Sequence, residues 1–439
     1  MSSPIETFGR AIQARIYRDG ISGKRPGVPV NPDRLEQAAR RAMSRNAWGY
    51  TAGSAGLETT AAANREAFDR WRIVPRMLTD VAERDLSIEL LGRRYPSPLL
   101  LAPIGVLELM HRQADLAVAR AARELSVPMT ISTQASHPME DIGAALGEAD
   151  RWYQLYWGSE PDVVASMVTR AERSGCSAIV VTLDTHIVGW RTRDLDRAFL
   201  PFARGQGIAQ YTSDPAFTEL VRQRAKQPRQ GDTPTPTPTA LRTLASIISH
   251  YPGSFWDNLR SRLPRAAVET FLDVFSNSAL TWGDLPWLRQ HTSLPILVKG
   301  LQHPDDAARA LDAGVDGVIV SNHGGRQVDG AIGALDALPG IVSAVDGRVP
   351  VLFDSGIRSG ADVFTALALG ASAVLVGRPY AYGLAIDGED GVRAVLEHLL
   401  AELDITMGLT GCRTIDDITR ERVEATPKPS APPTAASAR

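Results

Sequence analysis

The feature that most constrains the fold is a repeated alternation of short apolar or β-branched runs with amphipathic stretches, from residue 98 onward. Eight such runs occur, at residues 98–102, 128–132, 152–156, 178–184, 295–299, 317–321, 350–354 and 373–376. Stretches with helical periodicity lie between or after them, at residues 113–125, 162–174, 304–313, 361–369 and 391–406. This alternation is typical of repeated βα units around a parallel sheet.

The number of units distinguishes two parallel architectures. Eight units favour a closed (β/α)8 TIM barrel over an open doubly wound sheet. An open dinucleotide-binding sheet would carry a Gly-x-Gly-x-x-Gly turn after its first strand, and the sequence has none. We therefore predict an α/β chain that forms a (β/α)8 TIM barrel at residues 96–425.

Three segments lie outside the repeat. Residues 1–95 predict a mostly helical N-terminal segment that packs on the barrel, with helical stretches at 32–45 and 59–71 and a small-residue loop at 48–56. Residues 199–292 form a long insertion after the fourth strand, and so long an excursion predicts a lid or an oligomer contact. Within it we expect helices at 240–249 and 266–275 and an extended, flexible Pro-Thr run at 231–239. The tail at 426–439, rich in Pro, Ala and Ser, is predicted to be disordered.

Composition excludes several classes of protein. With 47 basic and 50 acidic residues the net charge is −3, which gives no electrostatic basis for binding nucleic acid or an anionic membrane. Cys176 and Cys412 form neither a disulfide framework nor a metal-ligand cluster, so we expect buried thiols, no metal and a reducing, cytoplasmic location. No signal peptide and no membrane-spanning run is found.

Polar or small residues stand at the ends of all eight runs, where a TIM barrel carries its active site. The first two runs end in small and hydroxyl residues, which leave room for a flat ring: Pro103, Ile104 and Gly105, then Ser132. The other ends carry Gln154 and Tyr156, Thr182 and Asp184 with Arg191 downstream, Lys299, Ser321 and His323 with Arg326, Asp354, Gly356 and Arg358, and Gly377 and Arg378. Any one of these has a plainer explanation, such as a core histidine or a rim ion pair. Their convergence indicates one site.

The sixth end combines a base with a cation. Ser321 and His323 are two residues apart, so on an extended backbone their side chains point the same way, and two glycines let the chain turn before Arg326. The Gly-rich seventh and eighth ends match the place where TIM barrels commonly bind phosphate. A phosphate site, a ring-sized space and a base beside an anion clamp together predict a flavin mononucleotide (FMN) enzyme that acts on a small carboxylate.

Three segments resemble a known family. Residues 321–330 (SNHGGRQVDG), 350–358 (PVLFDSGIR) and 368–371 (ALGA) are similar to motifs of the FMN-dependent α-hydroxy acid oxidases and dehydrogenases. The resemblance extends over about residues 48–417 apart from the insertion. It implies FMN as cofactor, a small 2-hydroxy carboxylate as substrate, and a homo-oligomer, either a tetramer or an octamer.

The resemblance also implies roles for individual residues. His323 would be the base, and Asp184 would orient it and stabilise its cation. Arg326 and Arg191 would bind the substrate carboxylate, while Tyr50 and Tyr156 would donate hydrogen bonds to the substrate and belong to the catalytic set. Lys299 would lie by flavin N1 and O2. The other cofactor residues would be Pro103, Ile104 and Gly105, Ser132, Gln154 and Thr182 at the ring edge, Ser321, and Asp354, Gly356, Arg358, Gly377 and Arg378 at the ribityl phosphate.

Within that family, Gly105, the long insertion and residues 183–191 most resemble lactate 2-monooxygenase. This resemblance implies oxidation of L-lactate by O2 to acetate, CO2 and water, with the insertion as a lid that retains the keto acid. Two alternatives stay open: an oxidase that releases the 2-keto acid and H2O2, and a dehydrogenase that uses another electron acceptor. A non-catalytic flavoprotein would require the loss of His323 or Arg326, and both are present.

Overall fold

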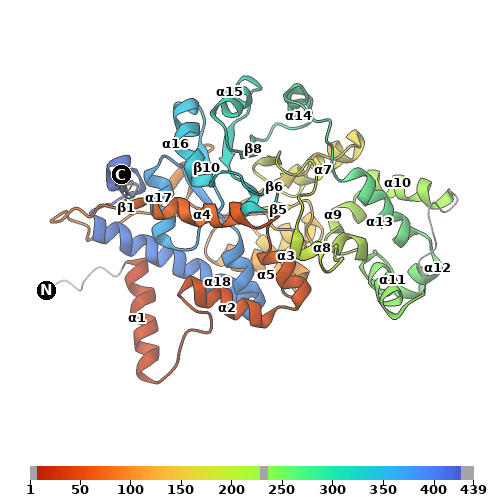
Figure 1. Ribbon diagram of the computed structural model, residues 1–439, viewed down its shortest axis with the longest axis horizontal. Helices are drawn as coiled ribbons and strands as arrows, with labels where there is room; N and C mark the ends of the chain where they lie inside the picture. The colour runs from red at the N-terminus through yellow and green to blue at the C-terminus, as the bar shows by residue number, and fades with distance from the viewer. Residues whose placement is uncertain (1–6, 228–235, 427–439) are drawn as a thin grey trace, which may run out of the picture.

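In the computed structural model, which describes residues 7–227 and 236–426, eight parallel strands close into a barrel (Figure 1). The order around the barrel is β10-β11-β4-β5-β6-β7-β8-β9. The strands are β4 (Leu99–Leu101), β5 (Met129–Ser132), β6 (Arg151–Leu155), β7 (Ile179–Thr182), β8 (Ile296–Leu301), β9 (Gly317–Val320), β10 (Val351–Phe353) and β11 (Ala373–Val376). Each predicted run overlaps one of these strands, so the predicted TIM barrel is confirmed.

The barrel interior changes from apolar to polar along the strands. Trp152, Val180, Leu297 and Ile319 belong to the buried cluster inside the barrel. Successive side chains of a strand alternate between its two faces, so residues two positions further along share the inner face. Those residues are Gln154, Thr182, Lys299 and Ser321, all of which are buried. A polar layer therefore lies above the apolar interior, at the carboxyl ends of the strands.

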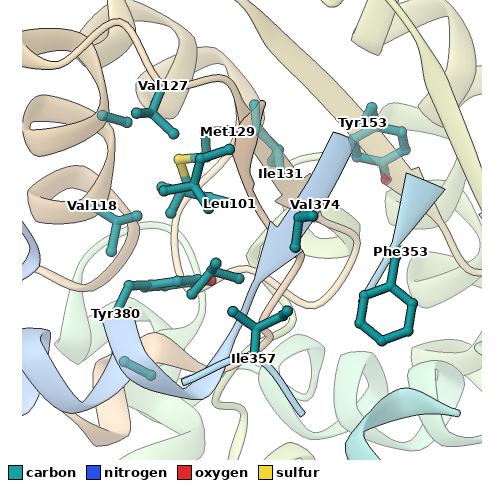
Figure 2. Close-up of a cluster of buried hydrophobic side chains, with 14 of the residues drawn as sticks. Leu101, Val118, Val127, Met129, Ile131, Tyr153, Phe353, Ile357, Val374 and Tyr380 are labelled. Atoms are coloured by element: carbon teal, nitrogen blue, oxygen red, sulfur yellow. The ribbon is translucent and has the colours of Figure 1, made fainter. Parts of the chain in front are cut away.

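The outer faces of the strands pack against a ring of helices. Figure 2 shows Leu101, Met129 and Val374 from the strands gathered with Val118 of α5 and Tyr380 of α18. The helices of the ring are α5 (Ala114–Glu124), α6 (Met139–Leu146), α7 (Pro161–Arg173), α15 (Pro304–Asp312), α16 (Ala334–Val345), α17 (Gly360–Ala368) and α18 (Arg378–Thr410). The helices predicted at 113–125, 162–174, 304–313, 361–369 and 391–406 are thus confirmed, and the last is part of a longer helix that breaks at Asp387 and Gly388.

From residue 7 on, where the described part begins, the N-terminal segment contains four helices and three short strands. They are α1 (Phe8–Ile21), α2 (Pro32–Ala42), α3 (Arg45–Ala52), α4 (Thr59–Asp69), β1 (Trp71–Ile73), β2 (Ile88–Leu90) and β3 (Arg93–Tyr95). Strand β1 pairs with β12 (Val423–Ala425) near the C-terminus, and β2 pairs with β3. The short strands were not predicted, because three residues give too little periodicity to recognise.

The loop predicted at residues 48–56 is wrong in its first half, since α3 extends to Ala52. The side chain of Ser44 caps this helix by accepting a hydrogen bond from the Ala47 N–H at 3.1 Å. Trp48 stacks on Tyr382 of α18, with ring centroids 5.8 Å apart. The cap and this tertiary contact override the low helix propensity of Gly49.

The long insertion between β7 and β8 is mostly helical and projects to one side of the barrel (Figure 1). Its elements are α8 (Thr192–Leu195), the 3-10 helix η2 (Pro201–Arg204), α9 (Ala209–Thr212), α10 (Pro215–Lys226), α11 (Pro238–His250), α12 (Phe255–Arg260), α13 (Leu263–Val274), η3 (Trp282–Asp284) and α14 (Leu285–His291). The helices predicted at 240–249 and 266–275 are confirmed by α11 and α13.

The Pro-Thr run lies partly outside the described residues, which resume at 236. Its predicted extended form is wrong at the end, because Pro238 starts α11 and the Thr237 side chain caps that helix. The predicted disordered tail also lies outside the described residues, except for Thr426, whose N–H donates to Arg70 O at 2.8 Å. The remaining short elements are η1 (Leu107–Leu109), η4 (His323–Gly325), η5 (Ile415–Asp417) and η6 (Arg420–Arg422). No helix in the described ranges is long and apolar enough to cross a membrane.

Candidate active site

His323 lies in the 3-10 turn η4, directly after strand β9. Its φ of 57° places it in the left-handed region, so the extended backbone expected from the sequence is wrong. Ser321 helps to hold this turn, because its hydroxyl accepts a hydrogen bond from the His323 N–H at 3.0 Å. The imidazole is thereby directed by a local turn and not by strand alternation.

The tautomer of His323 follows from its partners. Nδ1 lies 2.7 Å from Asp184 Oδ1, and an ionised carboxylate can only accept, so Nδ1 carries the proton. Nε2 is therefore the basic nitrogen, and it lies 3.5 Å from the Tyr156 hydroxyl. Both His323 and Tyr156 line the main cavity at the barrel mouth.

The electrostatic surroundings keep this pair ready to accept a proton. Burial lowers the pKa of His323, and Lys299 and Arg191 lower it further, although Asp184 acts in the opposite direction. Burial would raise the pKa of Asp184, but the neighbouring His323 and Lys299 outweigh it and hold that pKa at about 2. The site therefore presents a neutral imidazole backed by a carboxylate, which is the arrangement of a general base.

Asp184 is held in place by residues from two other loops. Gly300 has φ of 113°, and a Cβ there would lie 2.9 Å from Asp184 Cβ, so only glycine allows this approach. The Thr185 hydroxyl donates to Asp184 Oδ1 at 2.9 Å, and the Gln327 side-chain amide donates to Asp184 O at 2.6 Å. Thr185 and Gln327 were not assigned from the sequence, although Gln327 lies within the conspicuous 321–330 segment.

Two arginines meet beside this base. Arg326 donates to the Tyr50 carbonyl and to Gly53 O, and its guanidinium lies over the Tyr50 ring, 5.0 Å from the centroid. Arg191 donates to Gln327 Oε1 at 3.0 Å. Burial and the nearby Arg191 lower the pKa of Arg326 to about 9, because two cations share a dry site. An anion bound between them would relieve that repulsion.

A second charged group lies in the polar layer of the barrel. Lys299 Nζ is 3.1 Å from Asp354 Oδ2 and 2.9 Å from Ser321 Oγ. Burial would lower the pKa of Lys299, but Asp354 and Asp184 outweigh it and raise that pKa. The ammonium therefore stays charged at the inner wall of the cavity.

Two buried polar groups near this layer test whether a cofactor fits. In the described part of the chain, Gln154 Nε2 and Thr182 Oγ1 have no hydrogen-bond partner. Buried polar groups are nearly always paired, so this pair fits the polar edge of a bound ring. The other end of the Gln154 amide is fixed, since Oε1 accepts from the Ser132 hydroxyl at 3.2 Å.

Arg378 contacts protein groups at the end predicted to hold phosphate. Its guanidinium donates to Thr51 O at 3.1 Å, to Gly324 O at 2.9 Å, and to Gly53 O and Ser54 Oγ at 3.0 and 2.9 Å. It therefore fastens the end of α3 to the η4 turn, and its predicted phosphate contact stays a prediction.

The cavity brings most of the predicted site residues together. Its lining includes Tyr50, Pro103, Ile104, Gly105, Tyr156, Arg191, Lys299, His323, Arg326, Asp354, Gly356, Arg358, Gly377 and Arg378. Five predicted residues are not among those that line it: Ser132, Gln154, Thr182, Asp184 and Ser321. Several further residues line it that were not assigned from the sequence, among them Met110, Gln134, Val188, Phe202 and Phe275. Spacing alone gave no signal for the two phenylalanines, which come from the insertion. Within residues 7–227 and 236–426, no group of three or more His, Cys, Asp or Glu side chains could hold a metal ion.

A neutral base beside paired arginines, at the carboxyl ends of barrel strands, suits removal of a proton from a small organic acid. The fold and the site thus define a TIM-barrel enzyme that acts on carboxylates with the help of a ring-shaped cofactor. Residues 39–425 match the family model described as FMN-dependent dehydrogenase. The chain belongs to this FMN-dependent family, and FMN is its cofactor.

Similar proteins of known type agree with this assignment. The chain is 43% identical to an FMN-dependent α-hydroxy acid dehydrogenase of Penicillium citrinum, over 95% of this chain and 96% of that one. It is 40% identical to an L-lactate oxidase of Lysinibacillus sphaericus, over 88% and 90% of the two chains. The solved structure of a mandelate oxidase with (S)-4-hydroxymandelic acid superposes with a TM-score of 0.74 at 37% identity, covering 91% of this chain and 99% of that one. The resemblance to the family is confirmed, and the protein is an FMN-dependent oxidoreductase of α-hydroxy acids.

Proposed function

We propose that the enzyme oxidises a small L-2-hydroxy acid with O2 as oxidant. The proposed substrate is L-lactate, and the products from it are acetate, CO2 and water. The observation that carries the proposal is the geometry of His323: its basic Nε2 faces the same cavity as Arg326 and Arg191. A lactate molecule offers one carboxylate for the arginines and, on its α-hydroxyl or α-carbon, one proton for the base. The L-lactate oxidase among the similar proteins supports the choice of substrate.

The residues divide the work of this reaction. Arg326 and Arg191 bind the carboxylate, and the hydroxyls of Tyr50 and Tyr156 donate hydrogen bonds to the substrate. His323 Nε2 takes the proton, from the α-hydroxyl if a hydride leaves C2 or from the α-carbon if a carbanion forms. Asp184 stabilises the resulting imidazolium through its contact with Nδ1. FMN, when bound, accepts the two electrons that leave the substrate.

Residues in the polar layer would hold FMN. Lys299 would place a positive charge beside the ring, Gln154 and Thr182 would pair with its edge, and Ser132 supports Gln154. Pro103, Ile104, Gly105 and Ser321 would flank the ring, while Asp354, Gly356, Arg358, Gly377 and Arg378 would surround the ribityl phosphate. Preorganised charge of this kind needs no rearrangement when electrons arrive.

The proposed decarboxylation rests on the insertion. Phe202 of η2 and Phe275, which follows α13, line the cavity, so the insertion forms part of its wall. A wall of this kind supports retention of the keto acid until peroxide decarboxylates it. The second candidate is an oxidase that releases the keto acid and H2O2, which the oxidases among the similar proteins favour. A dehydrogenase with another acceptor is favoured by the name of the Penicillium citrinum relative.

Two measurements test the proposal. L-lactate should bleach the yellow flavin of the purified enzyme without oxygen, and His323→Ala should keep the flavin but slow this bleaching by at least about 10²–10⁴-fold. In air, acetate, CO2 and H2O2 are then quantified. Acetate equal to the lactate consumed supports the monooxygenase, whereas peroxide and pyruvate in equal amounts would show an oxidase.

We also propose a homo-oligomer, a tetramer or an octamer, in the cytoplasm. The exposed apolar side chains of Leu241, Trp256 and Leu259 on α11 and α12 support an assembly, because such groups are commonly covered in oligomers. The two free, buried cysteines, Cys176 and Cys412, support a reducing compartment. Light scattering of the purified protein should give four or eight times the chain mass of 47.3 kDa.

A further inference from the structure

Gln134 follows strand β5 and lines the cavity at the barrel mouth. The residue is only 7% exposed. Its backbone is fixed on both sides: the N–H donates to Ser132 Oγ at 3.1 Å, and the carbonyl accepts from the Val106 N–H at 2.8 Å. The side chain therefore starts from a rigid position in the wall of the site.

In the described part of the chain, the side-chain amide of Gln134 has no protein partner. Among the residues that the structure describes, neither its oxygen nor its nitrogen makes a hydrogen bond. The same cavity is also lined by the apolar side chains of Met110, Phe202 and Phe275. The rings of Phe202 and Phe275 belong to one aromatic cluster, with centroids 6.4 Å apart. An amide that faces a cavity without a protein partner is the kind of group that orients a ligand, because it can donate to and accept from a polar group placed there.

The contacts of Gln134 show where in the cavity this residue lies. A Cβ on Gly105 would lie 2.9 Å from Gln134 Cβ, so one side of Gln134 packs against Gly105, a residue assigned to the flavin ring. A Cβ on Gly207 would lie 3.1 Å from Gln134 O, so the other side touches the covering insertion. Gln134 is thus placed between the ring site and the insertion, which is where a substrate would be enclosed.

We propose that Gln134 is a specificity-determining residue that hydrogen-bonds a polar group on the side chain of the substrate. The pocket then favours short L-2-hydroxy acids with a hydroxyl on C3 over apolar acids of the same size. An amide suits this task because it can both donate to and accept from a hydroxyl. The inference rests on the proposed oxidation of L-2-hydroxy acids and extends it to the substrate side chain.

The test compares L-glycerate with L-2-hydroxybutyrate, which differ by a hydroxyl in place of a methyl group at one position. The wild-type enzyme should show the higher kcat/KM for L-glycerate. Gln134→Met, which keeps the size of the side chain, should lower the glycerate-to-hydroxybutyrate ratio by about 10-fold, because the bound hydroxyl loses its partner. The affinity for FMN should not change. Gln223→Met, at an exposed position on α10, is the matched control and should leave the ratio unchanged.

An unchanged ratio in Gln134→Met, with normal oxidation of L-lactate, would overturn the inference and leave the proposed function standing. A loss of FMN affinity with an unchanged ratio would also overturn it, since Gln134 would then serve the cofactor. If Gln134→Met does not fold, Gln134→Asn withdraws the amide by one methylene and should lower the same ratio. Failure of every 2-hydroxy acid to bleach the wild-type flavin would overturn the inference together with the proposed function.

Discussion

An ion pair between His250 of α11 and Glu108 of η1 ties the insertion to the barrel, and His250→Ala should loosen it. His250 Nε2 lies 2.6 Å from Glu108 Oε2, and its Nδ1 lies 2.7 Å from Ser246 O. Carboxylate and carbonyl oxygens only accept hydrogen bonds, so both ring nitrogens carry protons and the imidazole is cationic. Glu108 also accepts from the Gly207 N–H of the insertion at 3.0 Å.

The strength of this contact can be gauged from its burial. A hydrogen bond to a charged group contributes about 1.5–3 kcal/mol when well protected. The side chains of Glu108 and His250 are 16% and 31% exposed, so solvent screening reduces the contribution to about 1–2 kcal/mol. That loss would raise the population in which the insertion has opened by about 5–30-fold.

Hydrogen exchange of the Gly207 amide measures this opening. His250→Ala should accelerate its exchange by about 5–30-fold at about pH 6. Ser249→Ala, on the same helix, is the control, because the Ser249 hydroxyl donates only to carbonyls of α11. Equal exchange rates in wild type and His250→Ala would refute the reasoning.

The same contact should depend on pH. The hydrogen bond that His250 donates to Glu108 raises the pKa of His250, so the contribution of His250 is complete below about 6.5 and is lost as pH rises through its raised pKa. Burial opposes ionisation of Glu108, but His250 lowers its pKa, so that contribution is complete above about 4.5 and is lost only at lower pH. Gly207 exchange, corrected for its intrinsic rate, should therefore increase in alkaline solution in wild type, and this increase should be absent in His250→Ala.

Four further results are expected. Asp184→Asn removes the charge that stabilises protonated His323 and should slow flavin reduction about 10- to 100-fold in stopped flow, whereas an unchanged rate would exclude this role. Because the pKa of His323 lies below its ordinary value of 6.5, kcat/KM should stay level as pH falls through 6.5 and decline only below it. Lys299→Met leaves the buried Asp354 unpaired and should cost about 3–5 kcal/mol of stability in thermal unfolding, while adding Asp354→Asn should restore part of it. Gly105→Ala places a methyl group 2.9 Å from Gln134 Cβ and should raise the ratio of peroxide to acetate among the products; an unchanged ratio would show that Gly105 does not influence which product forms.

The barrel could be predicted from the sequence because its strands are buried on both faces. Runs such as residues 317–320 and 373–376 are continuously apolar, and they are bounded by helices with clear periodicity. The inward position of Gln154 and Thr182 follows from alternation along β6 and β7. Polar side chains at these positions are unfavourable without a partner, which is why they indicated a site.

Other parts of the site depend on contacts that spacing does not encode. Tyr50 lies on a helix because Ser44 caps it and α18 packs on it, although small residues surround it in the sequence. His323 takes a left-handed backbone that alternation could not predict. Phe202 and Phe275 reach the cavity only through the packing of the insertion.

The carbonyl of Gly53 accepts hydrogen bonds from two arginines that lie far along the chain, Arg326 and Arg378, at 2.9 and 3.0 Å. These contacts join residues 273 and 325 positions apart. During synthesis on the ribosome, the Gly53 carbonyl at the end of α3 would therefore lack its contact with Arg378 until most of the barrel has been synthesised. Contacts of such long range form late in folding, because closing so long a loop has a large entropic cost. Assembly of the catalytic cavity thus coincides with completion of the barrel, so a nascent or truncated chain that ends before Arg378 has no competent site to expose.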